Sequence, residues 1–368
     1  MKVTFPYMGA PAGYTKIGTM LGHEVIPPPK PTQRTIDLGV KYSPEFACFP
    51  MKILLGTYIE AIEKGADTII SSGGHGPCRA GFYGEIQSKI LKNMGYDVNV
   101  IILDSFFKYP KQTYANLKSI KNHNSWRQVW NTVHTCYRAI NILDEMERQL
   151  QVKRAYELNK GACSRVWNDI QQMVDETDDI KKLENVVRRE AQSMVDGIKQ
   201  IQVLEEEKIR VGIIGEIYVV MESAVNMKME ERLGELGCEV QRSQHLSDWV
   251  DFHLLPNRLS HPHEAVVRKK GTDYFGVGIG GHARENMGWI VEFKERGLDG
   301  IVHLLPFACL PELMSQSIIP AMSRDLDIPV LSLSLDEQTG RANILTRVEA
   351  FIDLLRARKS GKLRKEVV

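Results

Sequence analysis

The chain has 368 residues, is 43% hydrophobic and 25% charged, and has a formal net charge of +1 at pH 7. A chain of this length predicts two or three globular domains, and its balanced charge argues against nucleic acid or an anionic membrane as a partner. No apolar run approaches the roughly 20 residues of a membrane-spanning helix, and the first residues, MKVTFPYMGAPAGY, lack the apolar stretch and cleavage site of a signal peptide. We therefore expect a cytoplasmic protein.

Residues 1–112 have the pattern of an α/β lobe. A strand, a loop, a helix, a glycine and a further strand follow one another, which is typical of a βαβ unit with a parallel sheet. The expected elements, in chain order, are a strand over 2–8, a stiff loop over 27–34, a helix from about Pro50 to Gly65, a strand over 67–71, a helix over 81–95 and a strand over 96–103.

Residues 113–208 have a different character. Apolar residues recur at helical spacing between Trp126 and Leu143, and helical stretches rich in Glu, Lys, Arg and Gln follow. We interpret this part as a helical insertion between two lobes. Its charges are expected to form a solvated face, with a dimer contact as the alternative.

The α/β pattern returns at Lys208. The expected elements are strands over 208–215, 238–243, 298–307 and 328–336, and helices over 221–237, 310–324 and 343–359. The helix ending ELGCEV resembles NMGYDV in the first lobe, which suggests an internal duplication. The sequence thus predicts an α/β protein with two Rossmann-like lobes, parallel sheets and a helical insertion, divided as 1–112, 113–208 and 209–368.

Three of the six cysteines lie at expected helix N-termini: Cys48, Cys78 and Cys309. The backbone N–H groups and positive dipole end of such a site stabilise a thiolate or an anionic cluster. Cys78 and Cys309 also follow strands, where ligands bind in open α/β sheets. The remaining three, Cys136, Cys163 and Cys238, are interpreted as small buried hydrophobic residues.

Three thiolates without an obvious fourth ligand suit an iron–sulfur cluster with one open iron. Zinc bound by these cysteines and His75 is the competing interpretation, although structural zinc sites usually contain local C-x₂₋₄-C pairs and none occurs here. The third interpretation is that the cysteines are simply buried, because cysteine is commonly buried without any ligand.

Three segments of the chain resemble the 2-hydroxyacyl-CoA dehydratase family, and more closely its activase-related or double-cubane cluster branch. They are SPEFACFPMKILLGTYIEAIEKGADTIISSGGHGPCRAGFYGEIQ, HLLPFACLPELM and IPVLSLSLDEQTGRANILTRVEAFIDLL. The likeness covers roughly residues 1–110 and 208–360, with the motifs E-x-x-C-x-P, G-x-G-P-C-R, C-x-P-E and D-E-x-T-G in this order.

The resemblance implies an oxygen-sensitive [4Fe–4S] or double-cubane cluster, with Cys48, Cys78 and Cys309 in the ligand positions. It also implies a separate ATP-dependent iron–sulfur activase that supplies one low-potential electron. Dehydratases of the family use that electron to form a ketyl radical on a 2-hydroxyacyl-CoA, whereas double-cubane relatives reduce small molecules. Relatives form homo- or heterodimers, so a dimer is expected by analogy.

This chain departs from the double-cubane pattern, because such a cluster takes six cysteine ligands and three positions match here. We favour a single [4Fe–4S] cluster between the two lobes, with an open iron. The sequence has no phosphate-loop or other ATPase signature, so any ATP would be used by the partner.

Several other residues are candidates for the site. The catalytic candidates are Glu45, His75 and Glu216, and the residues expected beside the cluster are Arg79, Tyr83, Glu312, Asp336 and Glu337. Each has a plainer interpretation: Glu45 as a charge near a helix N-terminus, His75 as a loop residue, Arg79 in a surface pair and Glu312 as a helix cap. Asp336, Glu337, Thr339, Gly340 and Arg347 are expected to hold the shape of a loop near the cluster, with substrate contact as the alternative.

Two further patterns are weak. GVGIGG at 276–281 matches G-x-G-x-x-G, but TDYF before it is a poor strand, so a loop is expected. HPH at 261–263 is expected to be a surface turn. Three functions therefore follow from the sequence: an iron–sulfur dehydratase or reductase component, a non-catalytic electron-transfer or cluster-carrying subunit, and a zinc-stabilised binding protein.

Overall fold

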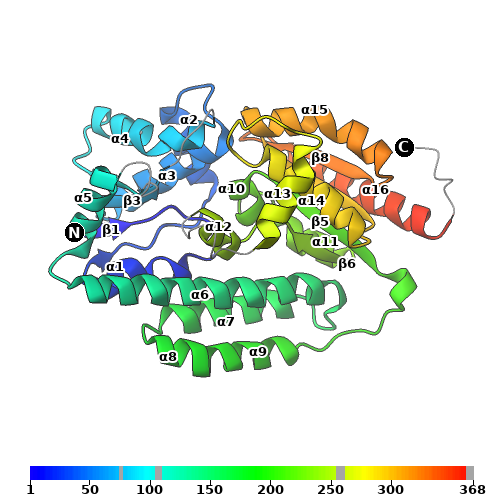
Figure 1. Cartoon of the computed structure of the whole chain (residues 1–368), viewed down its shortest axis with the longest axis horizontal. Helices are drawn as coiled ribbons and strands as arrows, with labels where there is room; N and C mark the ends of the chain where they lie inside the picture. The colour runs from blue at the N-terminus through cyan, green and yellow to red at the C-terminus, as the bar shows by residue number, and fades with distance from the viewer. Residues whose placement is uncertain (74–77, 104–109, 254–261, 362–368) are drawn as a thin grey trace. The chain divides into compact units, whose positions relative to one another are not determined.

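The computed structural model of the protein describes residues 1–73, 78–103, 110–253 and 262–361. The chain forms two compact units (Figure 1). The first unit comprises residues 1–145 and 168–193, and the second comprises residues 146–167 and 194–368.

A four-stranded parallel sheet forms the centre of the first unit, with the strand order β2-β1-β3-β4. The strands are β1 (Lys2–Thr4), β2 (Glu24–Val25), β3 (Thr68–Ser72) and β4 (Asn99–Leu103), and the helices are α1 (Lys16–Met20), α2 (Gln33–Tyr42), α3 (Phe49–Glu63), α4 (Tyr83–Asn93) and α5 (Pro110–Lys121). Val3, Ile70 and Ile101, one from each of three strands, are buried in one hydrophobic cluster. Parallel strands are covered by helices on both faces, which explains their near-continuous apolar sequence.

The second unit contains a parallel sheet of the same kind, with the order β6-β5-β7-β8. Its strands are β5 (Ile209–Gly215), β6 (Cys238–Arg242), β7 (Gly300–Pro306) and β8 (Val330–Leu335), and its helices are α10 (Ile217–Met221), α11 (Met229–Glu235), α12 (Leu246–His253), α13 (Pro262–Thr272), α14 (Ala283–Glu295), α15 (Leu310–Asp325) and α16 (Arg341–Lys359). The predicted α/β fold with two Rossmann-like lobes is confirmed.

The two units also share a closely packed helix pair before the third strand. In the first unit, a Cβ at Gly39 of α2 or Gly56 of α3 would lie 2.0 Å from a carbonyl oxygen of the other helix. In the second unit, a Cβ at Gly271 of α13 or Gly288 of α14 would lie 1.9 Å from such an oxygen. Glycine lets two helix backbones approach this closely because it has no side chain. The similarity of ELGCEV and NMGYDV suggested an internal duplication. The two units also share their strand order and this helix packing.

Residues 113–208 are largely helical, as predicted, and their helices are shared between the two units. They include α6 (Trp126–Lys153), α7 (Ala162–Asp175), α8 (Ile180–Lys182) and α9 (Arg188–Asp196). A buried cation ties the segment to the sheet region in each unit. Lys16 Nζ lies 3.0 Å from Asp178 Oδ1 in the first unit, and Arg242 pairs with Glu147 and, at 2.7 Å, with Glu230 in the second.

The predicted single helix over 221–237 is wrong. Helix α10 ends at Met221 and α11 begins only at Met229, and in the turn between them Met227 and Lys228 have positive φ angles. Asn226 stabilises the turn, because its Nδ2 donates to the Val219 carbonyl at 2.9 Å and its Oδ1 accepts from the Met229 N–H at 3.1 Å. An asparagine side chain that replaces backbone hydrogen bonds in this way ends a helix.

Five helices lie where no helix was predicted: α1, α2, α12, α13 and α14. The strand β2 was also not predicted. Helix α2 follows the proline-rich loop directly, and Thr32 and Thr35 form a capping box at its start. The glycine-rich residues 276–281 form the loop between α13 and α14, as expected. A helix rather than a strand precedes that loop, so the G-x-G-x-x-G match has no dinucleotide-binding context.

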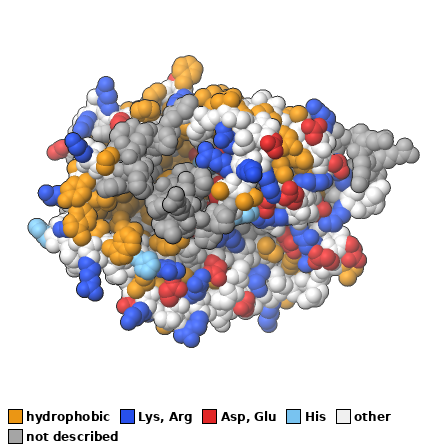
Figure 2. All heavy atoms as spheres, viewed as in Figure 1, with side chains coloured by type: hydrophobic (Ala, Val, Ile, Leu, Met, Phe, Trp, Pro, Cys, Tyr) orange, Lys and Arg blue, Asp and Glu red, His pale blue; other side chains and the backbone are white. Residues whose placement is uncertain are grey.

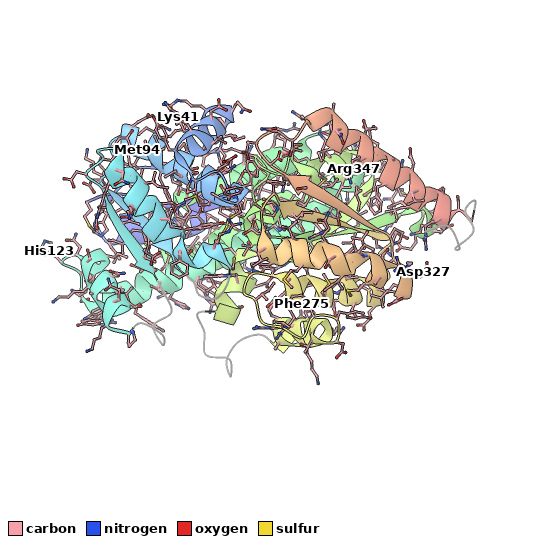
Figure 3. All side chains as sticks on the ribbon, turned by 90° about the horizontal axis from the view of Figure 1, so that it is seen from above. Lys41, Met94, His123, Phe275, Asp327 and Arg347 are labelled. Carbon is pink, nitrogen blue, oxygen red and sulfur yellow. The ribbon has the colours of Figure 1, made fainter. Side chains whose placement is uncertain are left out.

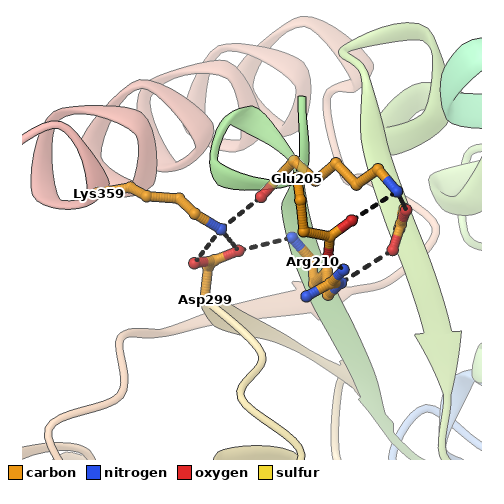
Figure 4. A network of polar contacts seen from close by, with 6 residues as sticks. Glu205, Arg210, Asp299 and Lys359 are labelled. Atoms are coloured by element: carbon orange, nitrogen blue, oxygen red, sulfur yellow. Dashed lines mark hydrogen bonds and ion pairs between the residues drawn. The ribbon is translucent and has the colours of Figure 1, made fainter. Parts of the chain in front are cut away.

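The amino edge of the second sheet is closed by charged side chains (Figure 4). Asp299 accepts from the Arg210 backbone N–H at 2.8 Å and pairs with Lys359 Nζ at 3.0 Å. Arg210 also pairs with Glu205, and with Glu239 at 3.0 Å. This network joins β5, β6, the start of β7 and the C-terminal helix α16, which gives this edge a structural role. The opposite, carboxyl edge is the one at which open α/β sheets bind ligands.

Exposed aromatic side chains gather on α5 and the start of α6 (Figure 2). Trp130 is 74% exposed, and Tyr114 stacks on Trp126 with ring centroids 5.7 Å apart. This apolar surface belongs to the helical segment for which a dimer contact was one interpretation. Within the described part of the chain, no helix combines the length and apolarity that crossing a membrane requires.

Candidate functional site

The shared strand order places two of the candidate cysteines at equivalent positions. In each sheet the third strand in sequence lies beside the first. The first strand connects to a neighbour on one side and the third to a neighbour on the other, so the two connections run in opposite directions. Ligands of open α/β sheets bind beyond the carboxyl ends of strands at such a point. Cys78 follows the third strand of the first unit, and Cys309 follows the third strand of the second unit.

All three cysteines are helix N-cap residues, as predicted. Cys48 caps α3, Cys78 caps a 3₁₀ turn that leads into α4, and Cys309 caps α15. Cys48 and Cys309 are each 6% exposed, and Cys78 is partly exposed. Backbone N–H groups at a helix start stabilise negative charge, so the three positions share one kind of electrostatic setting.

Contacts within the first unit bring the Cys48 loop and the Cys78 loop together. The hydroxyl of Tyr83, at the start of α4, is hydrogen-bonded to Cys48 Sγ. Arg79, which follows Cys78, donates to the Phe46 carbonyl. The two residues predicted beside Cys78 therefore join its loop to the segment that precedes α3.

The loop before Cys309 contains a non-glycine residue in the left-handed region. Ala308 has a φ of +61°, and the Cys309 N–H donates to the Pro306 carbonyl at 3.1 Å. The Phe307 N–H donates to the Leu335 carbonyl at 2.8 Å, which fixes the loop to the end of β8. A left-handed conformation costs an L-residue roughly 1–2 kcal/mol, so this tight turn is held by the surrounding hydrogen bonds.

We expect Ala308→Val to lower the free energy of unfolding by about 1–2 kcal/mol, because a β-branched side chain disfavours a positive φ more strongly than alanine does. Ala308→Gly is the matched control and should leave stability unchanged or slightly higher. Urea unfolding of both variants measures the difference. Equal stability of the two variants would contradict the backbone argument.

Glu312, in the first turn of α15, is the centre of a buried polar network. Its side chain is 0% exposed, and its Oε2 accepts from His303 Nε2 at 2.9 Å and from Asn286 Nδ2 at 2.8 Å. His303 Nδ1 lies 3.1 Å from the Ser332 hydroxyl. The carboxylate therefore accepts from β7 and α14 rather than capping its own helix. Its Oε1 is buried and has no hydrogen-bond partner in the described residues.

The same network reaches the end of β5. Asn286 Oδ1 accepts from the Gly215 N–H at 3.1 Å, and Asn286 Nδ2 also lies 3.2 Å from the Gly215 carbonyl. Gly215 has a φ of +147°, and a Cβ there would lie 2.0 Å from the Leu304 carbonyl oxygen. Only glycine fits between these strand ends, and it is followed directly by Glu216.

Glu216 caps α10, and its Oε2 accepts from the Val219 N–H at 3.1 Å. Burial, together with the nearby Glu312 carboxylate, raises the pKa of Glu216 to about 7. A carboxyl group with a pKa near neutrality exchanges protons readily at pH 7, as a general acid or base must. This property fits the catalytic role that the sequence suggested for Glu216.

The raised pKa of Glu216 makes stability depend on pH. The folded state favours the neutral carboxyl, so its contribution is present below about pH 4.5 and is lost as pH rises through about 7. We expect Glu216→Gln to be relatively more stable than the wild type at pH 8 than at pH 5, by about 2 kcal/mol. Urea unfolding at the two pH values tests this, with the exposed Glu349→Gln as control. A pH-independent difference would contradict it.

The D-E-x-T-G motif forms the turn between β8 and α16, as predicted. Asp336 Oδ1 accepts from the Gln338 N–H at 2.9 Å and from the Thr339 hydroxyl at 2.7 Å, and the Asp336 N–H donates to Thr339 Oγ1. Arg347 of α16, labelled in Figure 3, donates to the Ser332 carbonyl at 2.9 Å. Glu337 lies within this turn.

The structure places the other predicted residues as follows. Glu45 is exposed in the turn that precedes α3. The turn is closed by the Ala47 N–H, which donates to the Pro44 carbonyl. His75 and His261 lie outside the described residues. His263 is an exposed residue of α13, so the surface turn expected over 261–263 is wrong for its described part. Its Nε2 is hydrogen-bonded to Arg296.

The other three cysteines behave as buried hydrophobic residues, as predicted. Cys136, Cys163 and Cys238 are at most 7% exposed, and burial raises the pKa of each thiol to about 12. A protonated, enclosed thiol is a poor nucleophile and a poor metal ligand. These three cysteines are not helix N-caps, which distinguishes them from Cys48 and Cys309, whose burial is similar.

Sequence reasoning did not single out Asn286, His303 or His282. His303 had a signal, because it is the one titratable side chain between Gly300 and Pro306 in an otherwise apolar strand. His282 caps α14, and α14 corresponds to α3, so His282 occupies in the second unit the place of Cys48 in the first. The equivalence of His282 and Cys48 becomes visible only when the tertiary structures of the two units are compared.

Within the described ranges, no group of three or more His, Cys, Asp or Glu side chains is assembled as a metal site. No protein-family model matches the chain, and no curated protein matches it.

Proposed function

We propose that the protein binds an iron–sulfur cluster, a [4Fe–4S] cluster in the simplest case, through the thiolates of Cys48, Cys78 and Cys309. The observation that supports this most directly is that each motif cysteine is a helix N-cap. Thiolates are the usual ligands of such clusters, and N–H groups near the sulfurs tune their potential. The equivalent positions of Cys78 and Cys309 at the third strand of each sheet add to this support.

When bound, such a cluster supplies one-electron chemistry at low potential, and a dehydratase or reductase reaction resembling that of 2-hydroxyacyl-CoA dehydratases is the activity we propose. Glu216 is proposed to move a proton at its carboxyl oxygen, since its pKa is about 7. Tyr83 is proposed to donate a hydrogen bond to the Cys48 sulfur, which its hydroxyl contacts. A separate ATP-dependent activase is the proposed reductant, and a dimer is the proposed assembly.

The experiment is anaerobic purification followed by iron and acid-labile sulfide analysis and an ultraviolet–visible spectrum. About four irons and four sulfides per chain support one cubane, and about eight support a double cubane. An anaerobic assay with activase, ATP and acyl-CoA substrates then separates an enzyme from an electron-transfer subunit. Stoichiometric zinc, or no metal after reconstitution, would overturn the proposal.

A further inference from the structure

A small pocket lies in the second unit, beyond the carboxyl end of β6. Its volume is about 30 Å³, which is room for roughly two water molecules. The polar residues that line it are Ser243, Gln244, His245, Asp248, Glu264 and Glu285, and Trp249 and His282 also contribute. It belongs to one unit, and none of its polar residues is a cysteine or part of the Glu312 network.

Three consecutive residues after β6 each present a buried polar atom to which the described residues supply no hydrogen-bond partner. These atoms are Ser243 Oγ, Gln244 Oε1 and His245 Nε2, and their side chains are 2%, 8% and 3% exposed. Buried polar atoms in native proteins are nearly always hydrogen-bonded, because an unsatisfied one costs roughly 1–3 kcal/mol. Three such atoms on one pocket wall indicate a ligand-binding surface.

Neighbouring contacts make two of these atoms acceptors. Asp248 Oδ2 lies 3.5 Å from His245 Nδ1 and favours the proton on that nitrogen, which leaves a lone pair on Nε2. Burial, followed by the Arg242 guanidinium, lowers the pKa of His245 to about 3, which keeps the ring neutral. Gln244 Nε2 donates to the Gly215 carbonyl at 2.8 Å, so its Oε1 faces away from that contact.

Three carboxyl groups line the pocket, and two of them are paired with arginines. Asp248 pairs with Arg148 at 2.7 Å, and Glu285 pairs with Arg268 at 3.4 Å. No ion pair to Glu264 occurs within the described residues. Burial, followed by the Glu285 and Asp248 carboxylates, raises the pKa of Glu264 to about 7, and only Arg268 opposes this.

We propose that this pocket binds the head group of a small organic monocation of the ammonium or guanidinium type. The N–H groups of an ammonium would donate to His245 Nε2, Ser243 Oγ and the Glu264 carboxylate. Gln244 Oε1 is a further acceptor for a guanidinium. The indole of Trp249 would add a cation–π contribution. A hard divalent metal fits less well, because it prefers six or more oxygen ligands and the pocket offers a neutral imidazole and an amide among few carboxylates. Cation binding at this pocket does not depend on the proposed iron–sulfur cluster.

The test is isothermal titration calorimetry of the full chain with methylammonium chloride and guanidinium chloride, with sodium chloride holding the ionic strength constant. We expect saturable binding at millimolar concentrations, and none of acetamide, which is similar in size but neutral. Glu264→Gln is expected to raise Kd at least about tenfold, since it removes a charge-assisted hydrogen bond. Glu295→Gln, an exposed residue of α14, is the matched control and should leave Kd within about twofold.

Ser243→Ala is a milder second variant, because it removes one hydroxyl and no charge. We expect it to fold as the wild type does and to weaken methylammonium binding about threefold, a loss typical of one neutral hydrogen bond. Thermal unfolding without ligand checks the fold of each variant. Absence of saturable heat with both cations, equal affinity for acetamide, or unchanged Kd in both pocket variants would each overturn the inference.

Discussion

Serine in place of Cys78 is expected to remove most of the iron and sulfide from the anaerobically purified protein, from about four of each per chain to below about one. A serine hydroxyl is a much weaker ligand for iron than a thiolate, and an N-cap serine preserves the helix start. Cys48→Ser and Cys309→Ser should give the same loss. Chemical analysis and the visible absorption band of the cluster are the measurements.

Cys136→Ala is the matched control for these variants. This thiol lies on α6 and is buried, with a pKa of about 12, so its removal should leave the iron content unchanged. Circular dichroism distinguishes loss of cluster from loss of fold. Full iron content in any one of the three serine variants would remove that cysteine from the proposed ligand set, and full content in all three would refute the proposal.

Alanine in place of Glu312 is expected to lower the free energy of unfolding by about 3–5 kcal/mol, because removal of one partner from a buried polar pair leaves the other unsatisfied. The change would leave His303 Nε2 without an acceptor and Asn286 Nδ2 with the Gly215 carbonyl alone, and both residues are 0% exposed. Urea unfolding of the full chain, followed by tryptophan fluorescence, measures the change.

Two variants control the Glu312 experiment. Glu349→Ala, on the exposed face of α16, should change stability by less than about 0.5 kcal/mol. Glu312→Gln retains one acceptor oxygen and should fall between the wild type and Glu312→Ala. A loss below about 1 kcal/mol in Glu312→Ala would show that the network is not a main support of this strand edge.

The Glu312 network and the pocket proposed to bind a cation share one backbone group. The Gly215 carbonyl accepts from Asn286 Nδ2 at 3.2 Å and from Gln244 Nε2 at 2.8 Å. Glu216, the proposed proton-transfer residue, is next in the chain. Both features therefore rest on the carboxyl end of β5, which no larger residue than glycine can occupy in this conformation.

The sequence by itself determined the fold class and the positions of the three candidate cysteines. Strand runs such as 209–215 are apolar throughout because parallel strands are buried on both faces, and proline two residues after Cys48 and Cys309 marks the first helical turn. These are local signals, since each depends on neighbours a few residues away. For the same reason the N-cap positions follow from the sequence alone.

Only the tertiary structure decided which distant residues meet. Asn286, His303 and Glu312 lie on α14, β7 and α15, and no periodicity links them. The break between α10 and α11 likewise depends on the contacts of one asparagine, which outweigh the helical pattern around it. The correspondence of His282 with Cys48, and the acceptor-lined pocket, arise because the chain folds the same strand order twice and brings loops together at each carboxyl edge. Hydrogen bonds and burial between residues far apart in sequence are satisfied only there, so no local pattern reveals them.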